Sequence, residues 1–279
     1  MKPILVPTDF SKTAYNAMRY AVAIAKETGA KIILLHVEDD PTPIAAISSD
    51  TYKEPVMLED SYKRLREMVA LELKLFNEEA DLLITYDARV GDVVTEIISS
   101  AKLNKAGLII MGTQGADKFS NLILGSNTSN VMAKSTVPVL SVPLNGLYLG
   151  FNKIVLASDF HEIKDNSIFN ILLELTLLFK SEIAILSIQK NEQKILSVQN
   201  LFEKLNLEKV FKSVPYKFFS VISNDVSEAI DQFTKEQRAD LIVTIPQKHT
   251  FLELLFNKSI TRNLVFHTNV PLLSLPEVS

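Results

Sequence analysis

Three glycines between an expected strand and an expected helix form the strongest chemical motif in this sequence of 279 residues. Gly112 and Gly115 are separated by two residues, and Gly125 follows after nine more, directly before Ser126. Glycine allows positive φ angles and lets the backbone approach a ligand closely. A helix that begins at Ser126 presents N–H groups and a partial positive charge to an anion. The spacing therefore indicates a phosphate site, and a loop with turn glycines and a serine cap is the structural alternative.

Other catalytic and metal-binding patterns are weak or missing. No Gly-Lys-Ser/Thr follows these glycines, and no GxGxxG follows the first expected strand. No metal-ligand spacing links the four histidines, which are His36, His161, His249 and His267. His36 falls on a buried strand, where we expect a hydrogen-bonded core residue. The acidic residues 38–40 offer a place for Mg²⁺, with solvated surface as the alternative. We predict no catalytic residue, so any hydrolysis of a bound phosphate compound would be slow.

The elements that position the glycines occur twice, because the chain contains an internal repeat. ILVPTDF at 4–10 matches IVLASDF at 154–160, and GLIIMGTQG at 107–115 matches DLIVTIPQK at 240–248. VPVLSVP at 137–143 matches VPLLSLP at 270–276. Three matched segments in the same order indicate duplication. We predict domains at 1–146 and 151–279, joined by a linker at 144–152 that contains two glycines.

Each half alternates apolar β-branched runs with amphipathic helical patterns. In the first half we predict strands at 3–8, 31–37, 82–88, 107–112 and 138–142, and helices at 11–28, 57–79, 92–103 and 126–134. In the second half we predict strands at 153–158, 182–188, 217–221, 240–245 and 271–275, and a core helix at 168–179. Such strands, apolar on both faces, are typical of a parallel sheet covered by helices. The expected fold class is α/β, with two tandem doubly wound domains.

Composition excludes several classes of function. The net charge is −4, with no cluster of Lys and Arg among aromatic residues, so nucleic acid is not expected as a partner. There is no cysteine, which fits a reducing compartment. No apolar run approaches the roughly 18 residues of a membrane span, and the apolar start of the chain is too short for a signal peptide. We therefore expect a cytoplasmic protein that does not associate with membranes.

The glycine motif resembles that of ATP-binding universal stress proteins: Gly112-x-x-Gly115, nine residues, then Gly125-Ser126. ILVPTDFS at 4–11, LLHV at 34–37 and VPVLSVP at 137–143 resemble the same family. The resemblance implies a five-stranded parallel sheet of order 3-2-1-4-5 in each half, with ATP bound where the order reverses. Carried over to this sequence, the residues implied to bind the nucleotide are Pro7, Thr8, Asp9, Val37, Met111, Gly112, Gly115, Gly125, Ser126 and Asn127.

The resemblance also implies roles for these residues. The carboxylate of Asp9 would accept hydrogen bonds from ribose or adenine, and Val37 would meet the adenine edge through its backbone. Met111 and Gly112 would flank the base and the sugar. The last four residues of the set, 115 and 125–127, would cradle the phosphates. Asp9 has a second explanation as part of a strand-to-helix turn, because Asp159 stands at the matching place in the second half.

The second half has lost the glycines of the motif. Ile245, Lys248 and Lys258 stand where the first half has its three glycines, and only Ser259 is kept. Pro246 and a β-branched residue beside it restrict the loop further. We therefore predict one nucleotide for each chain, in the first half, and a degenerate second domain.

Three functions remain open at this point. The first is a stress-response or regulatory protein that binds ATP or a related adenine nucleotide, with or without Mg²⁺. The second is an interaction scaffold that binds no nucleotide. An ATP-using adenylating enzyme ranks last, because PTDFS at 7–11 lacks the glycines of its loop. Family resemblance further implies that the fifth strands pair within one chain, and a homodimer is the other open assembly.

Overall fold

A computed structural model describes most of the chain. The described residues are 1–39, 54–75, 82–113, 125–146, 148, 150–158, 160, 163, 165–189, 195–245 and 270–276. Several residues singled out in the sequence lie outside them: Gly115, Asp159, His161, Pro246, Lys248, His249, Lys258, Ser259 and His267. Within the described ranges, no helix combines the length and the apolar character needed to cross a membrane.

The first half alternates strands and helices as its apolar pattern predicts. Its elements are β1 (Ile4–Pro7), α1 (Lys12–Thr28), β2 (Ile32–Glu38), α2 (Glu54–Leu75), β3 (Ile84–Val90), α3 (Val93–Leu103), β4 (Leu108–Gly112), α4 (Ser126–Lys134) and β5 (Val139–Val142). Ser11 caps α1 by accepting from the Ala14 N–H at 3.2 Å, and Asp92 caps α3 by accepting from the Thr95 N–H at 2.8 Å. Side-chain caps of this kind fix where the helices begin.

The second half repeats the scheme. Its elements are β6 (Lys153–Ala157), the 3₁₀-helix η2 (Asn166–Phe169), α5 (Asn170–Phe179), β7 (Glu182–Gln189), α6 (Ile195–Lys204), α7 (Leu207–Val210), β8 (Tyr216–Ile222), α8 (Val226–Gln237), β9 (Leu241–Thr244) and β10 (Leu272–Ser274). The core helix expected at 168–179 is thus confirmed as the end of η2 followed by α5.

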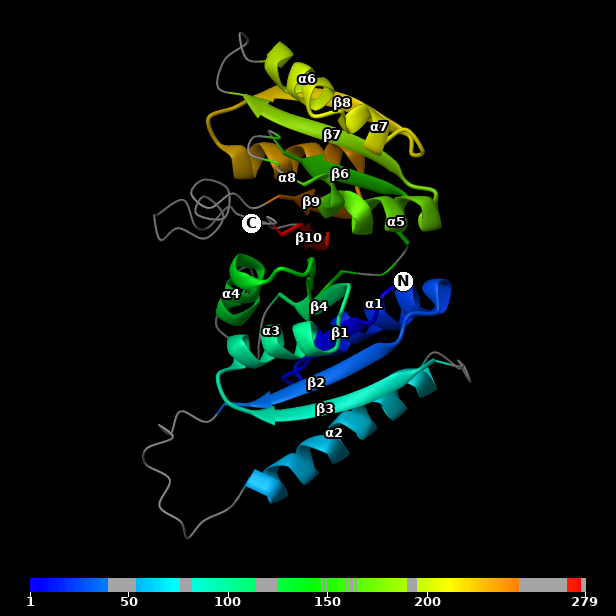
Figure 1. Ribbon diagram of the computed structural model, residues 1–279, viewed down its shortest axis with the longest axis vertical. Helices are drawn as coiled ribbons and strands as arrows, with labels where there is room; N and C mark the ends of the chain where they lie inside the picture. The colour runs from blue at the N-terminus through cyan, green and yellow to red at the C-terminus, as the bar shows by residue number, and fades with distance from the viewer. Residues whose placement is uncertain are drawn as a thin grey trace.

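The ten strands of the described residues form one sheet, in the order β3-β2-β1-β4-β5-β10-β9-β6-β7-β8 (Figure 1). Within each half the pairs are parallel and the order is the expected 3-2-1-4-5. β5 and β10 pair antiparallel, with Leu140 opposite Leu273, and the Ser141 hydroxyl donates to the Leu272 carbonyl at 3.3 Å. The predicted pairing of the fifth strands within one chain is confirmed, and it joins the two expected sheets into one.

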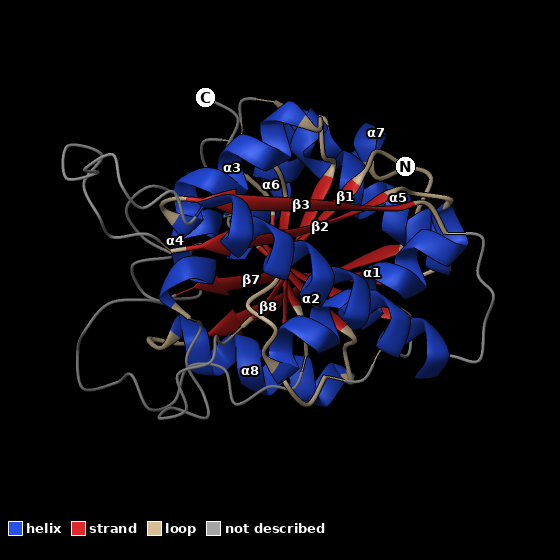
Figure 2. Cartoon of the chain, turned by 90° about the horizontal axis from the view of Figure 1, so that it is seen from below, coloured by secondary structure: helices blue, strands red, loops and turns tan. Residues whose placement is uncertain are grey.

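Helices cover both faces of this sheet (Figure 2). Two buried apolar clusters lie on opposite faces of the sheet. Ile4 and Val6 of β1 belong to one of them, and Leu5 belongs to the other. Because successive strand residues point to opposite faces, this division explains why the strands read as continuous apolar runs. Both clusters include residues from the two halves, such as Ile154 in the first and Val155 in the second. The core therefore continues across the junction between β5 and β10.

The connection between the halves, expected to be a linker, packs against α1. The side-chain amide of Asn16 donates to the carbonyl oxygens of Pro143 and Gly146, both at 2.8 Å. Phe151, at the end of the connection, is 1% exposed. Tyr148 and Phe151 give this glycine-containing connection the apolar surface with which it packs.

Candidate functional site

The sheet order of the first half reverses at β1, which lies between β2 and β4. Ile4 is aligned with Ile32 of β2 on one side and with Leu108 of β4 on the other. Chain connections leave these strands in opposite directions, so a crevice forms beyond their carboxyl ends, and ligands of open α/β sheets bind there. The described residues of the implied set lie at this edge: at the ends of β1, β2 and β4, and at the start of α4.

The turn from β1 to α1 presents Asp9 at the edge of the sheet. Asp9 is exposed, and its carboxylate accepts from the Ser11 N–H at 3.0 Å. Phe10, which follows, has a φ angle of 61°. Asp9 therefore supports the turn, as its structural explanation predicted, and its exposed position leaves the carboxylate open to a ligand. Pro7, by contrast, is buried as the last residue of β1.

Thr8 is committed to contacts within the protein. Its side chain is 6% exposed, and its hydroxyl donates to the sulfur of Met68 on α2 at 3.4 Å. Its N–H donates to the Leu35 carbonyl at 2.8 Å, and its hydroxyl oxygen accepts from the Phe10 N–H at 3.0 Å. Thr8 thus shapes the turn that carries Asp9, and its side chain points toward the protein interior.

Gly112, at the end of β4, is in close contact with the start of α1. A Cβ atom at this position would stand 2.7 Å from Thr13 Cβ and 2.8 Å from the Thr13 carbonyl carbon. Real side chains essentially never come so close. The sequence predicts a glycine here for the close approach of a ligand, and the structure adds a packing requirement. Sequence reasoning missed Thr13, because no pattern shows which helix meets the end of β4.

The start of α4 is the third part of the candidate site, beside the turn after β1 and the end of β4. Gly125 precedes the helix, and its N–H donates to the Thr113 carbonyl just beyond β4. Thr128, inside the helix, donates through its hydroxyl to the Gly112 carbonyl at 2.8 Å. These bonds hold the positive end of α4 against the end of β4.

Charge and exposure at α4 suit an anion. No acidic residue occupies the first turn, and no side-chain hydrogen bond caps the start of the helix in the part of the chain that the structure describes. Ser126 and Asn127 are both exposed there. Backbone N–H groups at a helix start bind phosphate well. These features are compatible with the predicted phosphate position, and Gly115 of the same motif lies outside the described residues.

Val37 and Met111 face the α3–α4 side of the sheet. Met111 is 6% exposed and belongs to the buried cluster on that side, and the half-buried Val37 packs against the same cluster. Their side chains are used in the core, so each can meet a nucleoside mainly through its backbone.

His36 links the ends of β1 and β2. Its Nδ1 lies 2.7 Å from the Thr8 carbonyl oxygen, and its Nε2 lies 3.1 Å from a carboxylate oxygen of Glu38. Carbonyl and carboxylate oxygens accept hydrogen bonds, so both ring nitrogens face acceptors. The Ser61 hydroxyl of α2 donates to the same Glu38 oxygen at 2.7 Å. The expectation that His36 is a hydrogen-bonded core residue is confirmed.

An aromatic contact extends this network to the surface. The rings of Phe10 and His36 lie 4.6 Å apart, and the Arg64 guanidinium lies 3.9 Å from the Phe10 ring centroid. Arg64 brings a positive charge from α2 to the turn that carries Asp9. Sequence reasoning missed Arg64 and Ser61, because helical periodicity places them on α2 without showing what they face.

We predict that Ser61→Ala lowers stability more at neutral pH than in acid. Burial raises the pKa of the Glu38 carboxyl, but hydrogen bonds from Ser61 and His36 and the charges of His36 and Arg64 outweigh it and lower the pKa overall. A lowered folded-state pKa gives stability that is present at neutral pH and is lost as the pH falls through that pKa. Ser61→Ala should lower the free energy of unfolding by about 1 kcal/mol at neutral pH.

Urea unfolding at neutral pH and near pH 3 measures this difference, with Glu59→Gln, an exposed carboxylate on the same helix, as the control. The loss in Ser61→Ala should shrink in acid, and Glu59→Gln should match the unaltered protein at both pH values. An equal loss for Ser61→Ala at both pH values would contradict the role given to Glu38.

No metal site accompanies these residues in the described part of the chain, where no group of three or more His, Asp or Glu could hold an ion. Of the acidic residues 38–40 suggested for Mg²⁺, Glu38 is bonded to His36 and Ser61, and Asp40 lies outside the described residues.

Comparisons with known proteins agree with this architecture. The model of the universal stress protein family matches residues 1–143. Universal stress protein Slr1230 of Synechocystis is 25% identical over 293 aligned residues, covering 98% of this chain and 99% of the relative. Universal stress protein MJ0531 of Methanocaldococcus jannaschii is 30% identical over 50% of this chain and 81% of its own.

Among solved structures, a universal stress protein from Archaeoglobus fulgidus shares the fold over 99% of this chain and 96% of its own, with a TM-score of 0.71 and 18% identity. Full-length similarity to this structure and to Slr1230 shows that the tandem arrangement occurs in other proteins. With the family model matching the whole first half, this chain belongs to the universal stress protein family.

Proposed function

We propose that the first half, residues 1–146, binds one adenine nucleotide, which is ATP or a related one. The observation that carries the proposal is the meeting of three features at the point where the strand order reverses. These are the exposed carboxylate of Asp9, the close-packed Gly112 and the start of α4, which no side chain of the described residues caps. Each supplies a different part of nucleotide recognition, and a sheet edge of this kind is where such ligands bind.

The phosphates would lie at the start of α4. Backbone N–H groups there donate to phosphate oxygens, with the Ser126 hydroxyl and the Asn127 amide as further donors. The nucleoside would lie between the ends of β1 and β2, where the Asp9 carboxylate accepts from ribose hydroxyls. Arg64, at the rim on α2, adds positive charge on the side of the turn.

The second half, residues 151–279, is proposed to bind no nucleotide. Ile245 stands where the first half has Gly112, and it is 8% exposed within the buried cluster. A buried apolar side chain at this place fills the space that a ligand would need. The proposed role is regulatory: occupancy of one site in the first half changes contacts that the two-part sheet makes with other proteins.

Calorimetric titration with ATP tests the proposal, and Asn127→Asp is the informative variant. A carboxylate in the first turn of α4 favours the helix but repels phosphate, so binding should weaken at least about tenfold while the fold is kept. Asn130→Asp makes the same change one turn further along α4, where Asn130 is also exposed, and should bind ATP nearly as the unaltered protein does.

Titrations with ADP, AMP and cyclic AMP rank the nucleotides, and chelation of Mg²⁺ shows whether the ion takes part. Absence of nucleotide binding by the unaltered protein would favour the other candidate, a scaffold of two domains that binds no nucleotide. Equal binding by Asn127→Asp and the unaltered protein would contradict the placement of the phosphates. Two nucleotides for each chain would contradict the asymmetry between the halves.

A further inference from the structure

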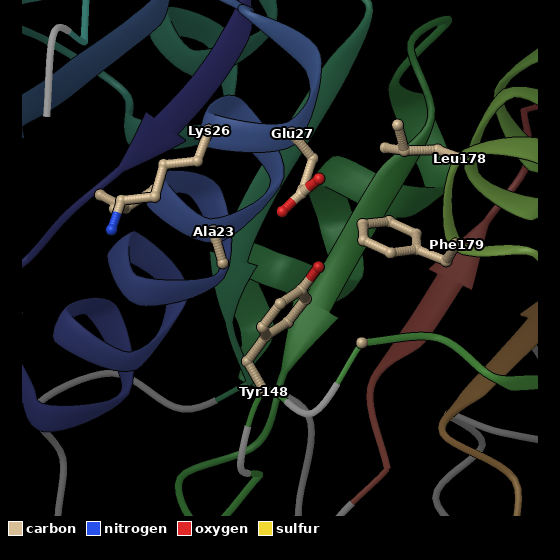
Figure 3. Close-up of a pocket in the computed structure, with 8 residues that line it drawn as sticks. Ala23, Lys26, Glu27, Tyr148, Leu178 and Phe179 are labelled. Atoms are coloured by element: carbon tan, nitrogen blue, oxygen red, sulfur yellow. The ribbon is translucent and has the colours of Figure 1, made fainter.

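A cavity of about 420 Å³ lies at the other end of α1, between the two halves of the chain. Ala23 and Glu27 line it from the last turns of α1, and Leu178 and Phe179 line it from the end of α5. Tyr148, from the connection between the halves, completes the wall (Figure 3). Its volume is within the range of about 300–1,000 Å³ typical of small-molecule sites. The candidate nucleotide site lies at the start of α1, so the two sites are separate.

Aromatic rings form the apolar part of this cavity. The Tyr148 and Phe179 rings meet edge to face with their centroids 6.2 Å apart. Phe151, which is 1% exposed, packs against both, at 5.6 Å from Tyr148 and 5.3 Å from Phe179. Tyr20 of α1 supports the Tyr148 ring from another side at 5.1 Å. Rings held in this way keep their orientation and present fixed surfaces to a ligand.

The Tyr148 hydroxyl is buried and forms no hydrogen bond with any described residue. It points toward the space between the Glu27 carboxylate and the Phe179 ring (Figure 3). Burial, and then the negative charge of Glu27, raise the pKa of Tyr148, so the hydroxyl keeps its proton. A buried hydroxyl without a partner is unfavourable for folding. Tyr148 lines the cavity, so a small shift of the groups around its hydroxyl would bring this unpaired oxygen within reach of a ligand.

The charge around the cavity favours a cation. α1 ends at Thr28 and α5 ends at Phe179, and the carboxyl end of a helix carries partial negative charge. Glu27 adds a full negative charge at the wall. Lys26 also lines the cavity, but its ammonium group extends away from Tyr148 and Glu27 (Figure 3). Glu27 would repel an anion in the space that the Tyr148 hydroxyl faces.

We propose that this cavity binds a small organic cation: an amine with an apolar body. Its ammonium group donates to the Glu27 carboxylate and to the Tyr148 hydroxyl oxygen. Its apolar part lies against the rings of Tyr148 and Phe179, whose faces also attract a positive charge. The ligand contacts α1 of the first half and α5 of the second, so its binding adds to the contacts between the halves. This inference does not depend on nucleotide binding.

Calorimetry with phenethylammonium tests the proposal, with 3-phenylpropionate as the matched anion. The cation should bind and the anion should not. Glu27→Gln should weaken binding of the cation by about fivefold, since the lost ion pair is at the surface. Tyr148→Phe removes only the hydroxyl and should weaken binding by a similar factor of about five. Glu59→Gln, an exposed carboxylate on α2, should leave the affinity unchanged.

Thermal unfolding of each variant establishes that it is folded, and Tyr148→Phe should unfold at or above the temperature of the unaltered protein. No binding of phenethylammonium at millimolar concentration would overturn the proposal. So would equal binding of the cation and the anion, or unchanged affinity in either Glu27→Gln or Tyr148→Phe. None of these outcomes bears on the binding of ATP, which is measured separately.

Discussion

Replacing Gly112 with alanine is expected to lower the free energy of unfolding by about 2–3 kcal/mol, because overpacking of close-packed sites has this magnitude. The added Cβ would stand 2.7 Å from Thr13 Cβ and 2.8 Å from the Thr13 carbonyl carbon. Backbone atoms in the first turn of α1 cannot rotate away as the end of a long side chain can. Relief therefore requires α1 to move away from the end of β4. Urea unfolding without nucleotide measures the effect.

Gly29→Ala is the matched control for Gly112→Ala. Gly29 ends α1 with a φ angle of 65°, and a Cβ there would meet nothing within 4 Å. Its replacement therefore measures backbone strain without a clash, which is about 1 kcal/mol for a single left-handed residue. Gly112→Ala should be the more destabilising of the two. A loss in Gly112→Ala no greater than in Gly29→Ala would show that α1 adapts at little cost.

Much of the fold could be predicted from the sequence, because duplication makes each half a check on the other. VPVLSVP and VPLLSLP mark the two fifth strands, and the structure pairs them. Most strand ends fall within two residues of the prediction, since each strand is an apolar run between polar turns. The predicted helix at 126–134 is confirmed as α4. α2 begins at Glu54, three residues before the prediction, because Pro55 is tolerated in a first helical turn.

The candidate site was less predictable, because its decisive contacts join elements that periodicity treats separately. The sequence predicts a requirement for glycine at position 112. It does not show that Thr13 occupies the space where a side chain would lie. It places His36 on a buried strand, but does not show that the ring reaches the Thr8 carbonyl oxygen at the end of the neighbouring strand. The cavity at Tyr148 was missed entirely, since the connection between the halves was interpreted as a linker. Contacts of this kind depend on how the helices dock on the sheet. The sequence of one helix does not show which residues of other elements it will contact.

The second large loss of stability is expected from a substitution at the junction between the halves. β5 and β10 are short, so few backbone hydrogen bonds join them, and the junction depends on apolar packing. Leu140 and Leu273 stand opposite each other there, and both are fully buried. Leu273→Asp would place a carboxylate against Leu140, and the buried residues that the structure describes include no lysine or arginine. An unpaired buried charge costs more than about 4 kcal/mol, which is a large part of the stability of an ordinary domain.

Leu273→Asp is therefore expected to separate the halves or unfold the second one under conditions where the unaltered protein is stable. Amide hydrogen exchange measures this directly, since β9 and β10 should lose protection before β1 and β2 do. Leu103→Asp is the control, because Leu103 is 70% exposed at the end of α3 and the same change there should alter stability little. Because the core crosses the junction, partial loss of protection should reach β5 as well. Unchanged protection of β10 in Leu273→Asp would contradict the dependence of the single sheet on this pair.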